Sequence, residues 1–259
     1  MSYVTTGLTS YVKEEGMPLI IKAVCQGKTA QMVNIISGLK GSAKVPFLTN
    51  DVVLADGATC DPSDASSTTF TQVPVTVAQV AYYEALCNPS ALENKSLIYS
   101  VTNPFAENVP FEADFMNSKT LGIQNAIEKL LWQGDSGSGD VIDGFPVTAD
   151  DNSLLIEVTG VTGSTYELVD GLITGAITAD CTWEDSDTAA VFMSYANFRL
   201  YIQALVNKNL FWYNPEAIKA GTEAVYHPGT KIKIVATSGL AGKSELYLAD
   251  TKHLHIGTN

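Results

Sequence analysis

One long apolar-patterned segment constrains this fold more than any other part of the sequence. Residues 110–132 place Ile123, Ile127 and Leu130 near one face of a helix, because residues three or four apart share a face. Acidic residues in the first turn suit the helix dipole, and Gly134 follows as a helix terminator. The pattern predicts a helix of about six turns at 3.6 residues per turn.

A second segment, residues 41–78, has the opposite character. Strand-like runs at 45–48, 52–54 and 68–77 enclose a tract of turn formers. The runs contain only scattered apolar side chains, so a hairpin made of them can hardly bury a core of its own. It must lie on its own domain or reach onto a neighbouring chain.

Shorter elements complete a mixed pattern without a regular βαβ rhythm, which predicts an α+β fold. A buried strand is predicted at 189–193, followed by a helix that Ser194 caps. Strands at 231–235 and 245–250 are predicted to pair as a closing hairpin. Further helices are predicted at 17–24, 30–36, 78–86, 89–99 and 166–177.

The turn of that predicted hairpin, TSGLAGKS from Thr237 to Ser244, ends like a phosphate-binding loop. The nucleotide motif G-x-x-x-x-G-K-[ST] needs glycine at the first position and a helix after it. Here the first position is Thr237, and a strand-like segment follows. The stretch is therefore interpreted as a turn, and Lys243 as a solvated charge that contacts no phosphate.

Composition limits the classes of partner. Charged residues make up 17% of the 259-residue chain, against about 25% in a typical soluble domain, so interfaces with other subunits are expected to cover part of the surface. The net charge of −13 argues against a basic patch for nucleic acid. No secretory signal or membrane-length apolar run is found, so reduced thiols in a cytoplasmic setting are expected.

No catalytic, cofactor-binding or metal-binding residue is predicted. Cys25, Cys60, Cys87 and Cys181 form no C-x-x-C pair. No serine-nucleophile, zinc-protease or dinucleotide frame occurs either.

Two other groups of side chains only superficially suggest a metal site. His253 and His255 alternate on a predicted strand and would share a face, but they have no third ligand at a defined spacing. Asp135, Asp140 and Asp143 depart from the calcium-loop order, so a flexible connection after the long helix is the better interpretation.

Three stretches in order carry a family resemblance. They are LLWQGD at 130–135 with DGFP at 143–146, VFMS at 191–194, and the closing strands that end in LHIGTN at 254–259. By these stretches and by its layout, the chain resembles the major capsid proteins of tailed bacteriophages, whose fold is shared with encapsulin shells. The resemblance covers most of the chain.

The resemblance implies a division of the chain and a role for each part. It implies an N-terminal arm with short helices at 1–40, an extended loop at 41–78, a peripheral domain with a spine helix at 79–145, an axial domain at 146–225 and a return to the peripheral sheet at 226–259.

The implied function is that of a non-enzymatic major capsid protein without cofactors, located in the virion after assembly in the host cytoplasm. Hexamers and pentamers would form an icosahedral shell around the phage genome. The implied partners are further copies and virion proteins such as portal, scaffold or decoration proteins, with no membrane. Contact with packaged DNA would be non-specific at most, through local clusters such as Lys22 and Lys28.

Two departures from the family pattern qualify these expectations. Residues 45–77 contain no lysine, which gives no support for the covalent cross-linking of some members. Family members usually add a further strand after a segment like 254–257, whereas this sequence stops at Asn259, and a scaffold is expected to be a separate chain. The alternatives are a secreted carbohydrate-binding or carbohydrate-processing protein, and another virion component such as a tail protein.

Overall fold

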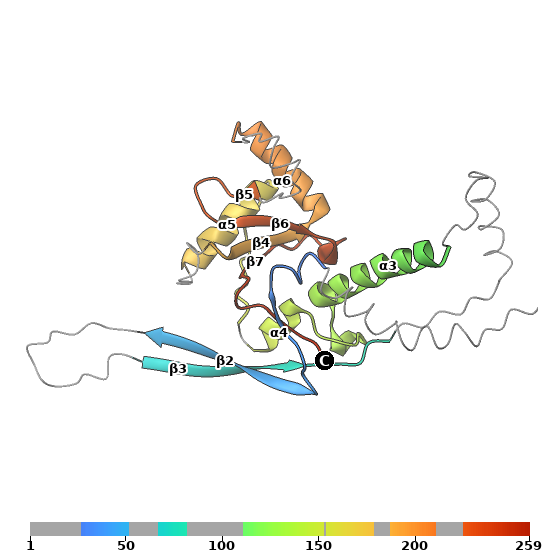
Figure 1. Cartoon of the computed structure of the whole chain (residues 1–259). Helices are drawn as coiled ribbons and strands as arrows, with labels where there is room; N and C mark the ends of the chain where they lie inside the picture. The colour runs from blue at the N-terminus through green and yellow to red at the C-terminus, as the bar shows by residue number, and fades with distance from the viewer. Residues whose placement is uncertain (1–26, 52–66, 82–110, 153, 179–186, 211–224) are drawn as a thin grey trace, which may run out of the picture.

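The structure, a computed structural model, describes residues 27–51, 67–81, 111–152, 154–178, 187–210 and 225–259. Helices and strands are mixed along the chain, as expected for an α+β protein (Figure 1). The described strands form one four-stranded sheet and two separate strand pairs. All four cysteines, Lys22, the helices predicted at 17–24 and 89–99 and most of the one at 78–86 lie outside the described residues.

The four-stranded sheet has the order β5-β6-β4-β7. Its strands span Val225–Tyr226 (β5), Lys233–Thr237 (β6), Ala189–Ser194 (β4) and Tyr247–Asp250 (β7). Strand β4 is buried at every position, which confirms the strand predicted from its unbroken apolar run. It lies parallel to β6 and antiparallel to β7.

Helices cover both faces of this sheet. Helices α5 (Thr165–Thr178) and α6 (Tyr195–Asn207) share a core with Val191 and Met193 of β4. Phe192, between those two residues, belongs to a second core with Trp132 of the long helix α3 (Phe111–Gln133). Successive residues of a strand point to opposite faces, so β4 connects the two cores.

The predicted hairpin of residues 231–235 and 245–250 is wrong, because β4 lies between the two strands. A central, fully buried strand needs a hydrogen-bonding neighbour on each edge for its backbone groups, and β6 and β7 supply them. The connection between them therefore passes from one side of β4 to the other. The resemblance implied a domain boundary after position 225, but the strands of this one sheet come from both sides of that position.

Helix α3 confirms the long helix to within a residue at each end. It ends where the amide of Gly134 donates to the carbonyl of Leu130 at 2.9 Å. A Cβ atom at Gly134 would lie 2.5 Å from the carbonyl oxygens of Leu130 and Ile142, so a larger residue does not fit. The face predicted to be apolar is only half-buried, and the most buried side chains of the described part of α3 are Glu128 and Trp132.

Helices α5 and α6 begin and end close to where the sequence predicted. Ser194 caps α6 through its Oγ, which accepts from the amide of Asn197 at 3.2 Å. On α5, a Cβ at Gly171 or Gly175 would collide with Val161 or Val158. The two glycines thus allow the preceding extended segment to pack closely on the helix.

The helix predicted at 30–36 is wrong. Residues 27–32 form a turn, and residues Asn34–Ile36 form strand β1, parallel to β8 (His255–Gly257). Val33, Ile35 and Ile36 are β-branched and favour a strand once β8 offers a partner. A short helix, α4 (Phe145–Asp151), was not predicted; Pro146 occupies its first turn.

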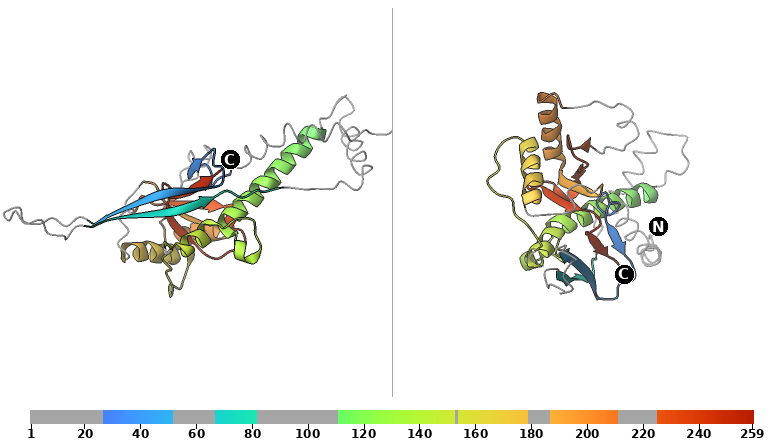
Figure 2. Two further views of the ribbon diagram at one scale, coloured as in Figure 1. Left: turned by 90° about the horizontal axis from the view of Figure 1, so that it is seen from below. Right: turned by 90° about the vertical axis from the view of Figure 1, so that its left-hand side faces the viewer.

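The two-stranded element is confirmed. Strands β2 (Ser42–Asp51) and β3 (Ser67–Thr76) pair antiparallel along ten residues each, and the connector 52–66 lies outside the described residues. Its base packs against β8, where a Cβ at Gly257 would lie 2.9 Å from Val75. Its other end extends away from the body, on the side opposite to α3 (Figures 1 and 2).

Candidate functional site

The stretch Thr237–Ser244 is a structural connection at the end of α3. Thr237 ends β6 and caps a 3₁₀ turn, η2 (Ser238–Leu240), by accepting from the amide of Gly239 at 3.2 Å. Lys243 follows as an exposed side chain, and strand β7 comes next. A nucleotide loop needs a helix after its lysine, and this geometry lacks it.

A buried carboxylate joins this stretch to two distant segments. Glu128 Oε1 accepts from the amide of Thr29 at 2.8 Å, and its Oε2 accepts from the hydroxyls of Thr237 at 2.9 Å and Ser238 at 2.7 Å. Trp132 Nε1 donates to Thr29 Oγ1 at 2.9 Å. We call these five residues the Glu128 joint.

The Glu128 joint is closely packed as well as hydrogen-bonded. A Cβ at Gly239 would lie 2.4 Å from the backbone oxygen of Glu128 and from the Trp132 ring. The Trp132 ring also packs against Phe145, Phe192 and Tyr247, with ring centroids 4.7 to 5.7 Å apart. The joint therefore fixes the segment around Thr29 and the four-stranded sheet to α3.

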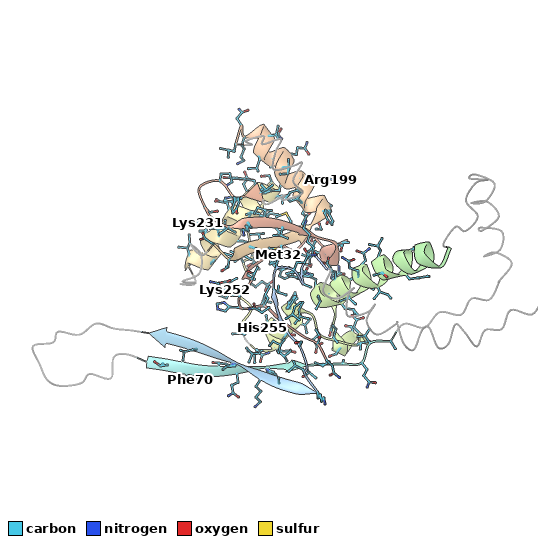
Figure 3. The ribbon with its side chains drawn as sticks, viewed as in Figure 1. Met32, Phe70, Arg199, Lys231, Lys252 and His255 are labelled. Atoms are coloured by element: carbon cyan, nitrogen blue, oxygen red, sulfur yellow. The ribbon has the colours of Figure 1, made fainter. Side chains whose placement is uncertain are left out.

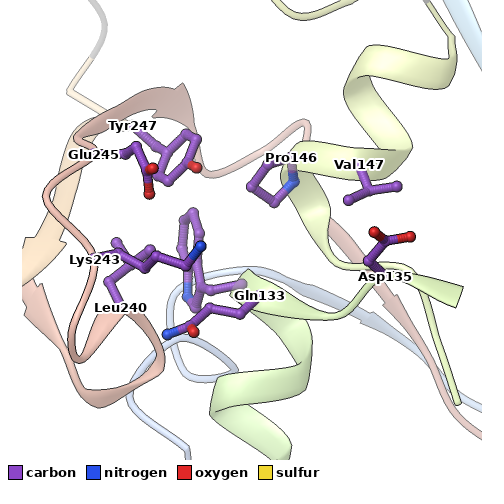
Figure 4. Close-up of a pocket in the computed structure, with 9 residues that line it drawn as sticks. Gln133, Asp135, Pro146, Val147, Leu240, Lys243, Glu245 and Tyr247 are labelled. Carbon is purple, nitrogen blue, oxygen red and sulfur yellow. The ribbon is translucent and has the colours of Figure 1, made fainter. Parts of the chain in front are cut away.

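A shallow pocket of about 210 Å³ lies beside the joint. Lys243 and Glu245 lie on one side of it, and Asp135, Pro146 and Val147 on the other (Figure 4). Asp135, one of the lining residues, accepts its hydrogen bonds from its own loop.

The aspartates after α3 cap their own loop. Asp135 accepts from the amide of Gly137 and the hydroxyl of Ser138, at 2.8 and 2.6 Å, around the 3₁₀ turn η1 (Ser136–Ser138). The Ser138 hydroxyl and the Gly137 amide hold the pKa of Asp135 below its usual range. Asp140 and Asp143 accept from the amides of Asp135 and Ser136. The connection expected to be flexible is thus a hydrogen-bonded turn.

The two C-terminal histidines do not alternate on one strand, as the sequence predicted, because His253 lies in a turn and only His255 is in β8. Both border a shallow surface with Val45 and Leu48. Burial lowers the pKa of His255, and His253 lowers it further. No set of three potential metal-ligating His, Cys, Asp or Glu side chains gathers anywhere in the described parts of the chain.

The third histidine lies in a buried aromatic cluster that the sequence did not reveal. His227 Nδ1 lies 2.9 Å from the Tyr201 hydroxyl, and the Tyr166 ring stacks on the imidazole at a centroid distance of 5.0 Å. The carboxylate of Asp170 lies 3.8 Å from Nε2. Burial lowers the pKa of His227 more than Asp170 raises it.

We expect His227 to make stability depend on pH. Its folded pKa lies below the ordinary value of 6.5, so the unfolded chain binds the proton first as pH falls. The stabilising contribution is complete above pH 6.5 and is lost as pH falls from there through the folded pKa. Thermal melts between pH 7.5 and pH 5 should show that Tm decreases less with falling pH in His227→Gln than in the wild type. An equal decrease in both proteins would contradict this assignment, and His253→Gln, at an exposed turn position, serves as the histidine control.

The β2–β3 hairpin exposes one complete face. Leu48 and Phe70 are directly opposite each other in the register and are 52% and 75% exposed, whereas Val45 and Val73 on the other face are half-buried. Figure 3 shows Phe70 on the protruding hairpin. Large apolar side chains paired on a protruding element are typical of a contact surface. The outer hairpin face comprises Lys44, Pro46, Leu48, Phe70, Gln72 and Pro74.

Two of the three comparisons with known proteins gave no match: neither a protein-family model nor a curated protein is similar to this chain. Solved structures are similar. One from Mycobacterium phage Bobi has a TM-score of 0.47 and 13% identity, covering 89% of this chain and 71% of its own. A capsid of a native GTA particle has a TM-score of 0.42 and 10% identity, covering 91% and 81%.

The first of these structures comes from a phage, and the second is the capsid of a GTA particle. Their TM-scores lie below 0.5, so the function proposed below rests on the geometry of this chain. No helix in the described segments combines the length and apolar character needed to cross a bilayer.

Proposed function

We propose that this chain is a non-enzymatic shell subunit, a phage-type major capsid protein that assembles into hexamers and pentamers of an icosahedral shell around the genome. The observation that carries the proposal is the outer hairpin face. A two-stranded hairpin is at best marginally stable alone, and here it extends beyond the body with an exposed Leu48–Phe70 pair. A neighbouring subunit would bury that pair.

Each remaining part of the chain has a place in this proposal. Helix α3 is the spine, and the hairpin is the extended loop that lies over the next subunit. The four-stranded sheet with α5 and α6 is the axial lobe. The arm is expected in residues 1–40, of which 1–26 lie outside the described residues, and portal, scaffold or decoration proteins are the expected further partners.

Size-exclusion chromatography with negative-stain microscopy on the full chain tests the proposal directly. Closed shells, or hexamers and pentamers, support it. A protein that stays monomeric at every concentration and ionic strength tried would contradict it.

Phe70→Thr is expected to reduce particle yield about tenfold while leaving the subunit folded. Burial of a phenylalanine contributes about 1.5–3 kcal/mol, and threonine keeps the strand preference without the ring. Thr71→Ser, at the next position and on the opposite face of the hairpin, is the control and should assemble normally. Particle counts and a thermal melt of each variant measure both effects. Normal particle yield with Phe70→Thr would remove this face from the proposed contact.

A further inference from the structure

The outward side of α6 carries one cation followed by apolar residues. Arg199 is the only arginine in the sequence; it is exposed and forms no ion pair with any residue that the structure describes (Figure 3). Leu200 and Val206 on the same helix are each about half exposed. Arginine beside exposed apolar side chains is the composition enriched at the centres of protein interfaces.

The outward side of α5 carries the complementary pattern. Asp170 is exposed, and Ile177, seven residues further along, is about half exposed. The only cationic candidate near Asp170 among the described residues is His227, whose buried imidazole favours the neutral form. The carboxylate of Asp170 is therefore available to a cation from outside the chain.

We call Arg199 and Val206 the α6 stripe, and Asp170 and Ile177 the α5 stripe. In both stripes the charged residue comes first and the apolar residue follows, and the two stripes have the same length. Arg199 and Val206 are also seven residues apart, so each stripe spans about 10.5 Å at 1.5 Å per residue. Two helices side by side in the same direction would place the cation against the carboxylate and the valine against the isoleucine.

We propose that α6 of one copy packs on α5 of the next copy, with Arg199 paired to the partner's Asp170 and Val206 against the partner's Ile177. A second copy is the occupant that the charges favour. The exposed cation of α6 and the exposed carboxylate of α5 are complementary, and such a pair offsets part of the repulsion between copies that carry 28 acidic and 15 basic residues each. Because the two surfaces differ, the contact is head-to-tail, which builds rings when the rotation closes. The inference rests on the proposed shell function and names one contact within its rings.

Charge reversal tests this pairing. Arg199→Glu alone and Asp170→Arg alone are each expected to reduce the yield of rings or shells about tenfold or more, because each places like charges together. The double variant restores the opposite charges and should recover assembly to within about twofold of the wild type. Lys252→Glu, which makes the same charge change at an exposed site on another part of the surface, should assemble normally.

The outcomes separate this pairing from the shell function. Wild-type shells together with normal assembly of both single variants overturn the pairing and leave the shell function standing. A folded double variant that still fails to assemble also overturns the pairing. A wild type that never assembles overturns both proposals. If a charge-reversal variant does not melt cooperatively, the neutral variant at the same position, Arg199→Ala or Asp170→Asn, is used in its place. Normal assembly of both neutral variants would contradict the pairing.

Discussion

Ile234→Asp is expected to prevent folding, whereas Lys243→Ala, nine positions further along the chain, should leave folding and assembly almost unchanged. Ile234 is fully buried in β6 and lies opposite Val191 of β4 and Val225 of β5. An unpaired carboxylate in that cluster costs several kcal/mol or forces its own protonation, against a total stability of about 5–15 kcal/mol for a typical domain. Lys243 is exposed, and such substitutions usually stay within about 0.5 kcal/mol.

Soluble yield, circular dichroism and particle counts compare these variants. Ile234→Val is the matched control, expected to cost about 0.5–1.5 kcal/mol and to assemble. Equilibrium dialysis with ATP and GTP should show no binding to the wild type. Stoichiometric nucleotide binding that disappears with Lys243→Ala would overturn the structural interpretation of the TSGLAGKS stretch.

Glu128→Leu is expected to destabilise the subunit by about 3–5 kcal/mol. Leucine leaves the Thr29 amide and the Thr237 and Ser238 hydroxyls without their acceptor in a buried site, and each unsatisfied donor costs about 1–3 kcal/mol. The hydroxyls can turn to other acceptors, which is why the expected total is below the sum. Urea unfolding followed by tryptophan fluorescence measures the loss, since Trp132 belongs to the joint.

Glu128→Gln distinguishes lost hydrogen bonds from lost shape. Its amide oxygen can still accept from Thr29, and its NH₂ group can donate to the two hydroxyls once they rotate, so a loss of about 1–2 kcal/mol is expected. Glu245→Leu, at an exposed position, should remain within about 0.5 kcal/mol. Equal stability of Glu128→Leu and the wild type would show that the joint does not hold the three segments together.

Local patterns in the sequence predicted local structure well. The periodicity of residues 110–132, the unbroken apolar run at 189–193 and the capping serine at 194 each act within a few residues, and α3, β4 and α6 follow them. Strand pairing is not local. Nothing in residues 231–250 indicates that β4, from some forty residues earlier, lies between β6 and β7.

The same distinction explains what the sequence missed in the candidate sites. Glu128 receives its hydrogen bonds from residues 99 and 109 positions away, so its burial could not be predicted from the helix pattern. The only sequence signal was that Glu128 lies one turn before Trp132, so that the two side chains share a face of the helix. The scarcity of core residues in 41–78 predicted an exposed hairpin, but the Leu48–Phe70 pair depends on the register.

The central place of β4 has a consequence for synthesis of the chain. Both of its neighbours, β6 and β7, come later in the sequence, and β7 ends at Asp250. A growing chain therefore carries a mostly apolar strand with two open edges until the residues up to Asp250 have left the ribosome. Open strand edges are where chains pair with the wrong partner, so the nascent subunit is most vulnerable to aggregation in this interval. Translation speed and chaperone supply between the synthesis of β4 and that of β7 then influence how many subunits reach the assembly-competent state.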